Sequence, residues 1–511
     1  MISATLRVPL QTSSFASQFR RLAPDNLSAM HHLKGIVGEK NVLTGEQTSP
    51  YDKPYRYHGG RSLAVVQPIT TQQVSNILKY CHAHGIGVVP QGGNTGLVGA
   101  SVTHTNRTQI ILSTTLLNKD VFEFNADACT LAVGAGHILG DVNRKLAQYR
   151  VSLPIDVGSI DTCNIGGILA TNAAGTRAGR YGSAGKRALE ITVVVADGTI
   201  QTIPISFSTI APALPQDNSR IHSQNPFIGS QGWLGVITQA VLTLEPRPVQ
   251  SETVMLIPGN IGDIATIRKK FTTEYGREFT AFEWISAESL RLVAKHTHMP
   301  YLLKDVPESG EYALLIEVSS HDKEKDLNKK ILGTQEALYK DGLIINGING
   351  HPEIYWKHRH AIADSLTKAG TIIATDIALR NNDLEPFIQT VTPELRSKYP
   401  HLVIAPFGHG MLGAMHYNAI WPTEHPIKIT PQDKYSIQKY IYDRVFQYEG
   451  TFSAEHGIGP HNQWAYDAYI PAKVKQDADM LKKMYDPRGI LNPNIYYGSN
   501  RDIKMEPCLS R

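Results

Sequence analysis

The chain has 511 residues, of which 41% are hydrophobic and 19% charged, and its formal net charge is only +4. A chain of this length exceeds what one hydrophobic core usually serves, so we expect at least two domains. The small net charge, without a basic stripe interleaved with aromatic residues, excludes nucleic acid as a predicted partner. No apolar run approaches the ~20 residues of a membrane-spanning helix, so we predict no transmembrane segment.

The first 24 residues contain Arg7, Arg20 and Arg21 and no acidic side chain. This composition is compatible with an organellar transit peptide and also with a simple extension of a cytoplasmic protein. We predict a cytoplasmic protein, with the mitochondrial matrix as the alternative. The four cysteines form no Cys-x-x-Cys pair, which is typical of a reduced compartment.

The first half of the chain alternates predicted strands and helices. Val74, Ile77, Leu78 and Cys81 recur at helical spacing after a capping threonine, and a strand follows from Gly87. Runs rich in β-branched residues, bounded by turn residues, predict further strands at 108–114, 130–136, 190–200 and 235–246.

The two prolines in EPRPVQ (245–250) mark a predicted domain boundary. Beyond it, YALLIEVSS (312–320) predicts a strand, and the segments 355–370 and 383–400 predict helices. A last helix is predicted from residue 472, before the Pro and Gly of DPRGILNP.

Two glycine-rich stretches, 88–101 and 156–185, follow predicted strands. Glycines permit positive φ and close approach of the backbone, so exposed N–H groups can surround a phosphate. The first stretch is no Walker A loop, because no Gly-Lys-Ser/Thr follows. Ordinary turns would explain either stretch alone, but the two together favour a large flat ligand.

Five motifs in order carry a family resemblance: PQGGNTGLVG, IGGILATNAAG with a following RYG, ITVVVADGT, FIGSQGWLGVIT and DPRGILNP. They resemble the FAD domain of the p-cresol methylhydroxylase / vanillyl-alcohol oxidase superfamily, and within it the branch of the D-2-hydroxyglutarate and D-lactate dehydrogenases. The resemblance runs from about residue 35 to 498.

The resemblance implies an α+β fold, with a two-part FAD-binding domain of the vanillyl-alcohol oxidase type and an α+β substrate (cap) domain with an antiparallel sheet. The implied division is a lead-in (1–57), an FAD domain (58–247, in subdomains 58–130 and 131–247), a cap (248–455) and a C-terminal segment returning to the FAD domain (456–511).

The resemblance also implies FAD contacts. Carried over by position, they are Gln91, Gly92, Gly93, Asn94, Thr95, Gly96, Leu97, Ser159, Gly166, Gly167, Asn172, Tyr181 and Ile237. Some relatives bind flavin covalently through a His in the first loop. Asn94 and Thr95 stand there instead, so we expect non-covalent FAD.

The stretch PFGHGMLGAMHYNAIWP (406–422) permits two interpretations. Gly408, Gly410 and Gly413 match the Gly-x-Gly-x-x-Gly dinucleotide fingerprint, but that fingerprint needs a following helix and AMHYNAIWP predicts a strand. His409 and His416 instead suit a metal, and FSAEHGIG (452–459) adds Glu455. Two unrelated structural histidines would be the alternative.

The family resemblance agrees with the metal interpretation. It implies that His409, His416 and Glu455 hold a divalent metal, for which we expect Zn²⁺. It also implies that His456 is the catalytic base and that Asn418 lines the substrate site. Arg359 would hold the substrate carboxylate; a solvated helix arginine is the alternative.

Four departures from the family pattern narrow this expectation. Leu412 and Ala414 replace polar residues between the two histidines, and Gln231 and Trp233 stand in the motif usually written GSEGTLG. Asn462 stands where Lys or Arg is common. Ala363 and Ala374 occupy the positions that grip the distal carboxylate of hydroxyglutarate, so an apolar pocket wall is expected there.

The leading hypothesis is an FAD- and metal-dependent dehydrogenase that oxidises a D-2-hydroxy acid to the 2-oxo acid. We expect a neutral or apolar substrate side chain, as in D-lactate, with D-2-hydroxyglutarate still open. The expected partner is an electron acceptor, namely an electron-transfer flavoprotein, a quinone or a cytochrome. The oligomeric state is left open, with a homodimer as one alternative. The alternatives are a flavin oxidase and a repurposed flavin-binding protein.

Overall fold

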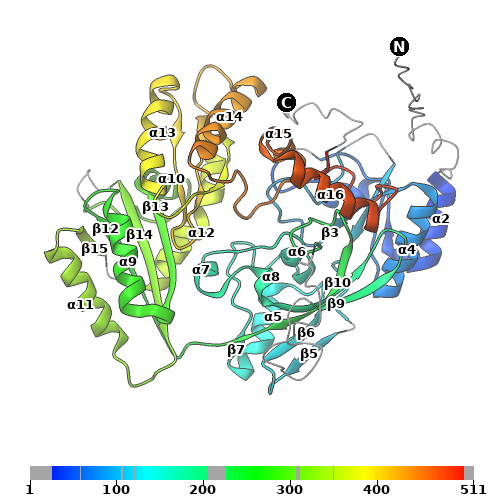
Figure 1. The fold of residues 1–511 in the computed structure, drawn as a ribbon, viewed down its shortest axis with the longest axis horizontal. Helices are drawn as coiled ribbons and strands as arrows, with labels where there is room; N and C mark the ends of the chain where they lie inside the picture. Colours follow the sequence, from blue (N-terminus) through cyan, green and yellow to red (C-terminus); the bar gives the residue numbers. More distant parts are fainter. Residues whose placement is uncertain are drawn as a thin grey trace, which may run out of the picture.

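The structure is a computed structural model that describes residues 26–499, except 58, 105–107, 120, 205–225, 307–310 and 349. Figure 1 shows two lobes: an N-terminal lobe (residues 26–247) at the right, and a cap lobe (residues 248–455) at the left. The C-terminal segment (residues 456–499) lies against the N-terminal lobe. Residues 1–24, for which a transit peptide was the alternative, and Cys508 lie outside the described residues, and the cysteines within the described residues are free.

The N-terminal lobe begins with a mixed sheet in the order β1-β2-β4-β3, in which β2, β4 and β3 run parallel. Helix α4 (Thr71–His84) connects β2 to β3 as predicted: Thr70 accepts the Gln73 N–H, and Gly85 ends the helix at φ 66°. Its periodic apolar residues are buried, as expected for an amphipathic helix. The elements are α2 (Asn26–Val37), β1 (Val42–Leu43), α3 (Ser49–Asp52), β2 (Ala64–Val66), α4, β3 (Gly87–Gln91) and β4 (Gln109–Ser113).

A second, antiparallel sheet of this lobe has the order β5-β6-β10-β8-β9. Short helices stand beside it and carry the second glycine-rich stretch. The elements are β5 (Phe122–Asn125), β6 (Thr130–Gly134), α5 (Leu139–Leu146), β7 (Val151–Ser152), α6 (Ile165–Ala170), α7 (Ala178–Tyr181), α8 (Ala184–Arg187), β8 (Ala188–Val194), β9 (Ile200–Pro204), β10 (Val236–Thr243) and β11 (Glu245–Pro246).

The cap lobe is built on a seven-stranded antiparallel sheet in the order β15-β12-β14-β13-β19-β20-β17. Every residue of β13 and β14 is buried, because core clusters cover both faces of the sheet. The strands are β12 (Gln250–Pro258), β13 (Phe279–Ser286), β14 (Tyr312–Ser320), β15 (Ile344–Ile348), β17 (Asp376–Ala378), β19 (Phe407–His409) and β20 (Ala414–His416).

Helices cover this sheet, and a small sheet of β16, β21 and β18 extends the lobe. The elements are α9 (Asp263–Tyr275), α10 (Ala287–His296), α11 (Leu327–Lys340), α12 (Pro352–Ala369), β16 (Gly370–Ile373), α13 (Leu384–Lys398), β18 (Val403–Ile404), β21 (Ala419–Pro422) and α14 (Pro431–Gln447). No described helix is both long enough and apolar enough to cross a membrane.

Residues 414–422, predicted as one strand, form two: β20 and β21 belong to different sheets. The chain leaves the first sheet at Tyr417, which is fully buried and whose carbonyl accepts the Thr375 hydroxyl at 2.7 Å. No helix follows the glycines of 408–413, which confirms that the dinucleotide match is a coincidence.

Helices α15 (Gly459–Tyr469) and α16 (Ala472–Tyr485) bring the C-terminal segment back to the N-terminal lobe. Lys482 donates to the carbonyls of Trp233 (2.6 Å) and Leu491 (2.9 Å), and Leu491 forms a bridge with Val88. The DPRGILNP segment, which was predicted to end α16, therefore also contacts β3 and holds the C-terminal segment against the N-terminal lobe.

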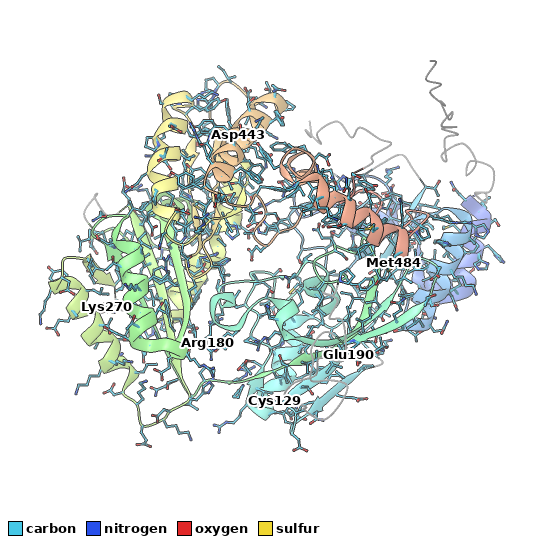
Figure 2. All side chains as sticks on the ribbon, in the orientation of Figure 1. Cys129, Arg180, Glu190, Lys270, Asp443 and Met484 are labelled. Atoms are coloured by element: carbon cyan, nitrogen blue, oxygen red, sulfur yellow. The ribbon has the colours of Figure 1, made fainter. Side chains whose placement is uncertain are left out.

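The two lobes also meet directly at α7. Arg177 forms ion pairs with Asp156 of its own lobe and Glu317 of the cap, each at 2.7 Å. Arg180 stands at the same junction, where Figure 2 shows it between the lobes, and donates to the Arg277 carbonyl at 2.7 Å. These contacts fix the walls of the cavity between the lobes.

Candidate active site

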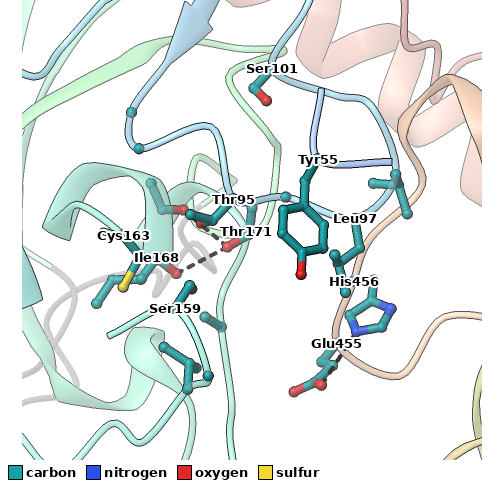
Figure 3. Close-up of a pocket in the computed structure, with 18 of the residues that line it drawn as sticks. Tyr55, Thr95, Leu97, Ser101, Ser159, Cys163, Ile168, Thr171, Glu455 and His456 are labelled. Atoms are coloured by element: carbon teal, nitrogen blue, oxygen red, sulfur yellow. Dashed lines mark hydrogen bonds and ion pairs between the residues drawn. The ribbon is translucent and has the colours of Figure 1, made fainter. Parts of the chain in front are cut away.

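A cavity of about 680 Å³ lies between the two lobes. Both glycine-rich stretches line one side of it, and residues of α12, β19, β20 and the loop before α15 line the other. Figure 3 shows Thr95, Ser159 and Thr171 on the glycine-rich side, facing Glu455 and His456. The cavity therefore joins the predicted flavin loops to the predicted metal ligands.

The first glycine-rich loop is held from behind by its own polar side chains. Gln91 is 2% exposed and donates to the carbonyls of Tyr51 (2.9 Å) and Ser101 (2.8 Å). Asn94, at φ 54°, donates to the Lys53 carbonyl and accepts the Ser101 hydroxyl, each at 2.8 Å. The side chains thus fix the loop, and its backbone faces the cavity.

The cavity-lining set contains most of the predicted FAD contacts but not all of them. Gln91, Gly92, Gly93, Asn94, Thr95, Gly96, Leu97, Ser159, Gly166, Gly167 and Ile237 line it. Asn172 and Tyr181 do not; the side-chain Oδ1 of Asn172 accepts the Gly185 N–H at 2.9 Å instead. Of the two unusual residues of the GSQGWLG motif, Gln231 lines the cavity and Trp233 does not.

Two features of this side fit a large ligand with polar edges. A Cβ added at Gly96 or Gly167 would meet no protein atom within 4 Å, so the backbone there borders open space. Asn164 is 3% exposed, and its side-chain oxygen has no hydrogen-bond partner among the described residues. This oxygen was missed by the sequence analysis and is suited to a ligand N–H.

The two predicted histidine ligands lie on paired strands. His409 ends β19 and His416 ends β20, and a turn with Gly413 at φ 66° joins the strands. In the register, His416 is opposite Phe407 and His409 is opposite Ala414. The histidines are therefore diagonal neighbours on one face of the sheet, although seven residues separate them in the chain.

Each histidine has a carboxylate on the next strand outward. Glu283 of β13 is opposite His409, and its Oε1 lies 2.6 Å from the His409 Nδ1. Asp376 of β17 is opposite His416, with Oδ1 3.4 Å from Nδ1. Such carboxylates fix the orientation and tautomer of a metal-binding imidazole.

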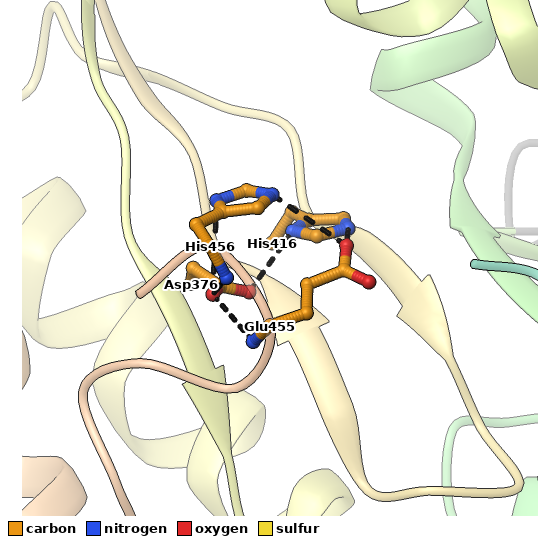
Figure 4. A group of neighbouring side chains, drawn as sticks. All are labelled: Asp376, His416, Glu455 and His456. Atoms are coloured by element: carbon orange, nitrogen blue, oxygen red, sulfur yellow. Dashed lines mark hydrogen bonds and ion pairs between the residues drawn. The ribbon is translucent and has the colours of Figure 1, made fainter. Parts of the chain in front are cut away.

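Glu455 and His456 come from the loop before α15. Asp376 holds this loop, because its Oδ2 accepts the N–H groups of Glu455 (2.9 Å) and His456 (2.7 Å). Gln231 holds the next turn, because its Oε1 accepts the N–H groups of Ile458 (3.1 Å) and Gly459 (3.0 Å). Figure 4 shows the ring of His416 between the carboxylates of Asp376 and Glu455.

The three imidazoles face one carboxylate oxygen. Glu455 Oε1 lies 3.6 Å from His409 Nε2, 3.4 Å from His416 Nε2 and 3.5 Å from His456 Nε2. Ligands about 2.1 Å from a tetrahedral Zn²⁺ are separated by about 3.4 Å. The buried Nε2 of His409 has no hydrogen-bond partner among the described residues. The donor set therefore fits a divalent cation.

Asp376, His416, Glu455 and His456 offer a second possible ligand set, with atoms within 4.8 Å of one another. Asp376 is the weaker candidate, because one oxygen already accepts two backbone N–H groups and the other faces the Nδ1 side of His416. We therefore favour His409, His416 and Glu455 as ligands, with Asp376 positioning the histidine and the loop.

The charged side chains of the cluster shift the pKa values of its histidines and of Glu455. Burial lowers the pKa of His409, but Glu283 and Glu455 outweigh it and raise this pKa to about 10. Burial would raise the pKa of Glu455, yet the facing histidines hold it well below its usual range. For His456, Asp376 and Glu455 outweigh burial and raise the pKa. The cluster thus favours an ionised carboxylate beside imidazoles.

The other predicted catalytic residues also line the cavity. Arg359 of α12 is 8% exposed, and its Nε and Nη2 lie 2.7 and 2.6 Å from Glu283 Oε2. Asn418 donates to the His416 carbonyl at 3.1 Å. Ala363 and Ala374 line the same wall.

Besides Asn164, three residues of the site escaped the sequence analysis: Glu283, Asp376 and Arg56. Glu283 connects His409 to Arg359 and is fully buried. Asp376 lies two residues after Ala374, the one residue of the ATDIA segment for which the sequence predicted a role. A charged residue within a buried strand was the available signal for both acids, since such residues are rare without a partner.

Two family models match the chain. One, described as an FAD binding domain, matches residues 62–204. The other, described as the C-terminal domain of FAD linked oxidases, matches residues 250–495. Together they include most of the residues that line the cavity, on both of its sides.

Named relatives agree with these models. A mitochondrial D-2-hydroxyglutarate dehydrogenase of Rattus norvegicus is 31% identical over 439 residues, which cover 85% of this chain and 78% of the relative. A putative mitochondrial D-lactate dehydrogenase of Schizosaccharomyces pombe is 30% identical over 490 residues, covering 91% and 89%. The structure of p-cresol methylhydroxylase has a TM-score of 0.71 at 16% identity, covers 94% of this chain and 99% of that one, and agrees in fold.

Proposed function

Because the chain belongs to the FAD-linked oxidases, in their D-2-hydroxyglutarate and D-lactate dehydrogenase branch, we propose that it oxidises a D-2-hydroxy acid with a neutral or apolar side chain. The product is the 2-oxo acid. The observation that carries the proposal is one cavity in which three imidazoles and Glu455 face the glycine-rich loops.

The reaction removes a hydride and a proton from the substrate. The two glycine-rich loops would hold FAD non-covalently, and this group would supply the acceptor for the hydride of the α-carbon. His409, His416 and Glu455 would hold a divalent cation, for which we propose Zn²⁺, and this cation would supply the Lewis acidity that lowers the pKa of the substrate hydroxyl. His456 takes the hydroxyl proton at Nε2, the nitrogen that faces Glu455.

The surroundings of His456 support its role as the base. Asp376 and Glu455 raise its pKa, so they stabilise the imidazolium that proton transfer creates. Gln231 and Asp376 hold the backbone of its loop on both sides. The ring therefore keeps its place while its charge changes.

Arg359 and Asn418 orient the substrate in this proposal. Two nitrogens of Arg359 are engaged with Glu283, which leaves Nη1 for the substrate carboxylate. Ala363 and Ala374 offer no cation to a second carboxylate. An unpaired carboxylate is costly to bury, so the wall favours D-lactate over D-2-hydroxyglutarate.

Anaerobic flavin reduction tests this function. The FAD-loaded protein is mixed with D-lactate, L-lactate and D-2-hydroxyglutarate, and the flavin absorbance is followed. We expect bleaching by D-lactate, slower bleaching by D-2-hydroxyglutarate and none by L-lactate. If no D-2-hydroxy acid bleaches the flavin, the proposal is refuted. If the protein releases peroxide during turnover in air, it is an oxidase and not a dehydrogenase.

The names of both relatives place those proteins in mitochondria. We propose the mitochondrial matrix for this chain too, in place of the cytoplasm predicted from composition, and an electron-transfer flavoprotein, quinone or cytochrome as the acceptor. Fractionation of cells that express the full chain tests the location.

A further inference from the structure

We propose that Arg56 is a second arginine that binds the substrate carboxylate and supplies the cavity with its unneutralised positive charge. This inference rests on the proposed function, because it assumes that the cavity takes a hydroxy acid. It concerns the lead-in to the N-terminal lobe, a segment for which the sequence analysis assigned no role.

The charged side chains that line the cavity differ in how they are partnered. Apart from the histidines, they are Arg56, Asp156, Arg359, Asp364 and Glu455. Asp156 pairs with Arg177, Asp364 accepts the Tyr55 hydroxyl, and Glu455 faces the imidazoles.

The two arginines of this set stand in opposite electrostatic situations. Arg359 is within 2.7 Å of the fully buried Glu283 through two nitrogens, so its charge is balanced inside the protein. Among the described residues, none forms an ion pair or hydrogen bond with Arg56, and its Nε is buried without a partner. Burying a guanidinium N–H without an acceptor is costly, which indicates that an acceptor arrives with a ligand.

The neighbours of Arg56 place it at the substrate end of the cavity. The preceding residue, Tyr55, lies between the glycine-rich loops and the Glu455–His456 pair in Figure 3. Its hydroxyl donates to Asp364 of α12 at 2.5 Å, so the segment touches the helix that carries Arg359. On the other side, Tyr57 stacks on His461 with ring centroids 3.9 Å apart.

The electrostatics of this corner are positive. Burial and, to a smaller extent, the charges of Arg56 and Lys434 together lower the pKa of His461 to about 3. His461 is therefore neutral and offers Arg56 no counter-charge. Asp364, the acid on the facing helix, already accepts the Tyr55 hydroxyl.

One unneutralised cation matches one carboxylate. A D-2-hydroxy monocarboxylate brings a single negative charge, which Arg56 balances while Nη1 of Arg359 adds a hydrogen bond. A second carboxylate would face Ala363 and Ala374 and find no cation there. The charge count and the apolar wall together therefore support a monocarboxylic substrate.

The test compares R56Q, R56K and the matched control R61Q in the FAD-loaded protein. Arg61 is exposed, lies five residues along the same segment and does not line the cavity. Binding of pyruvate and of its uncharged methyl ester is measured by the perturbation of the flavin absorbance, and the kinetics of D-lactate are measured alongside.

We expect R56Q to weaken pyruvate binding and raise the KM for D-lactate by about 10- to 100-fold, because a charge-assisted hydrogen bond is lost. Binding of methyl pyruvate should change less than 3-fold, R56K should retain part of the affinity, and R61Q should behave as the unaltered protein.

Equal effects of R56Q on pyruvate and on its ester would overturn the inference, as would a loss of bound FAD with pyruvate affinity unchanged. Failure of the unaltered protein to reduce its flavin with D-lactate would instead refute the proposed function. The two failures are therefore distinguishable.

Discussion

The glycine-rich side of the cavity and the histidine cluster opposite it are built in different ways. On the glycine-rich side, Gln91 and Asn94 point away and fix the loop, so the backbone forms the surface. In the cluster, side chains form the surface, and strand register sets their positions: Glu283 opposite His409, and Asp376 opposite His416. One side depends on the absence of side chains and the other on their exact chemistry.

This difference implies that the two sides fail independently. A change in the cluster should abolish chemistry and leave FAD in place, because none of the loop-fixing hydrogen bonds involves the cluster. A change in the loops should release FAD and leave the cation. Two kinds of contact join them: the Gly175 N–H donates to Glu455 Oε2 at 3.3 Å, and Gln231 of the GSQGWLG motif donates to the His456 carbonyl at 3.4 Å.

The largest effect is expected from His456→Asn. Loss of the proton acceptor should lower the rate of flavin reduction by about 10²- to 10⁴-fold. FAD content and cation content should not change, because neither side of the cavity loses a holding contact. Stopped-flow absorbance with D-lactate measures the rate, and a decrease below 10-fold would remove His456 as the base.

Removal of the cation should come next. Dialysis against a chelator should lower the rate of flavin reduction by about 100-fold or more, since the hydroxyl loses its polarising partner. The flavin spectrum should keep its intensity, and added Zn²⁺ should restore the rate. Release of FAD together with the metal would contradict the independence of the two sides.

Glu283→Gln should act on the cluster more mildly. His409 would lose its charged partner, so the affinity for the cation should fall by about 10- to 100-fold while FAD binding is unchanged. Competition with a chromophoric chelator measures this affinity. Glu288→Gln, on the partly exposed surface pair with Arg291, is the control and should have no effect.

The smallest effect is expected on the glycine-rich side. A Cβ at Gly93 would lie 2.0 Å from the Thr162 carbonyl oxygen, so Gly93→Ala must displace one loop from the other. We expect a loss of about 1–3 kcal/mol in the free energy of unfolding and weaker FAD retention. Gly35→Ala, where a Cβ meets nothing within 4 Å, should cost nothing. Thermal unfolding and FAD fluorescence provide the measurements.

The sequence predicted the fold well where periodicity and motif order carry the information. The residues buried in α4 were those with helical spacing, and the order of five motifs indicated the FAD-binding architecture. It also brought His409, His416 and Glu455 together as candidates, and these three lie around one point.

The sequence could not predict contacts that depend on strand pairing. Glu283 is 126 residues from His409, and only the pairing of β13 with β19 brings them together. For the same reason, the sequence did not predict that Arg359 pairs with Glu283. It therefore could not show that Arg359 is paired and Arg56 is not. The break between β20 and β21 was missed because both strands are apolar and differ only in the sheet they join.

The central claim is that one divalent cation is held beside the flavin loops by His409, His416 and Glu455. A crystal of the protein, measured at the zinc absorption edge, tests it by anomalous scattering. We predict one peak about 2.0–2.2 Å from the Nε2 atoms of both histidines and from Glu455 Oε1. A filled flavin cleft with no peak at these atoms, or with the three side chains apart, would contradict it.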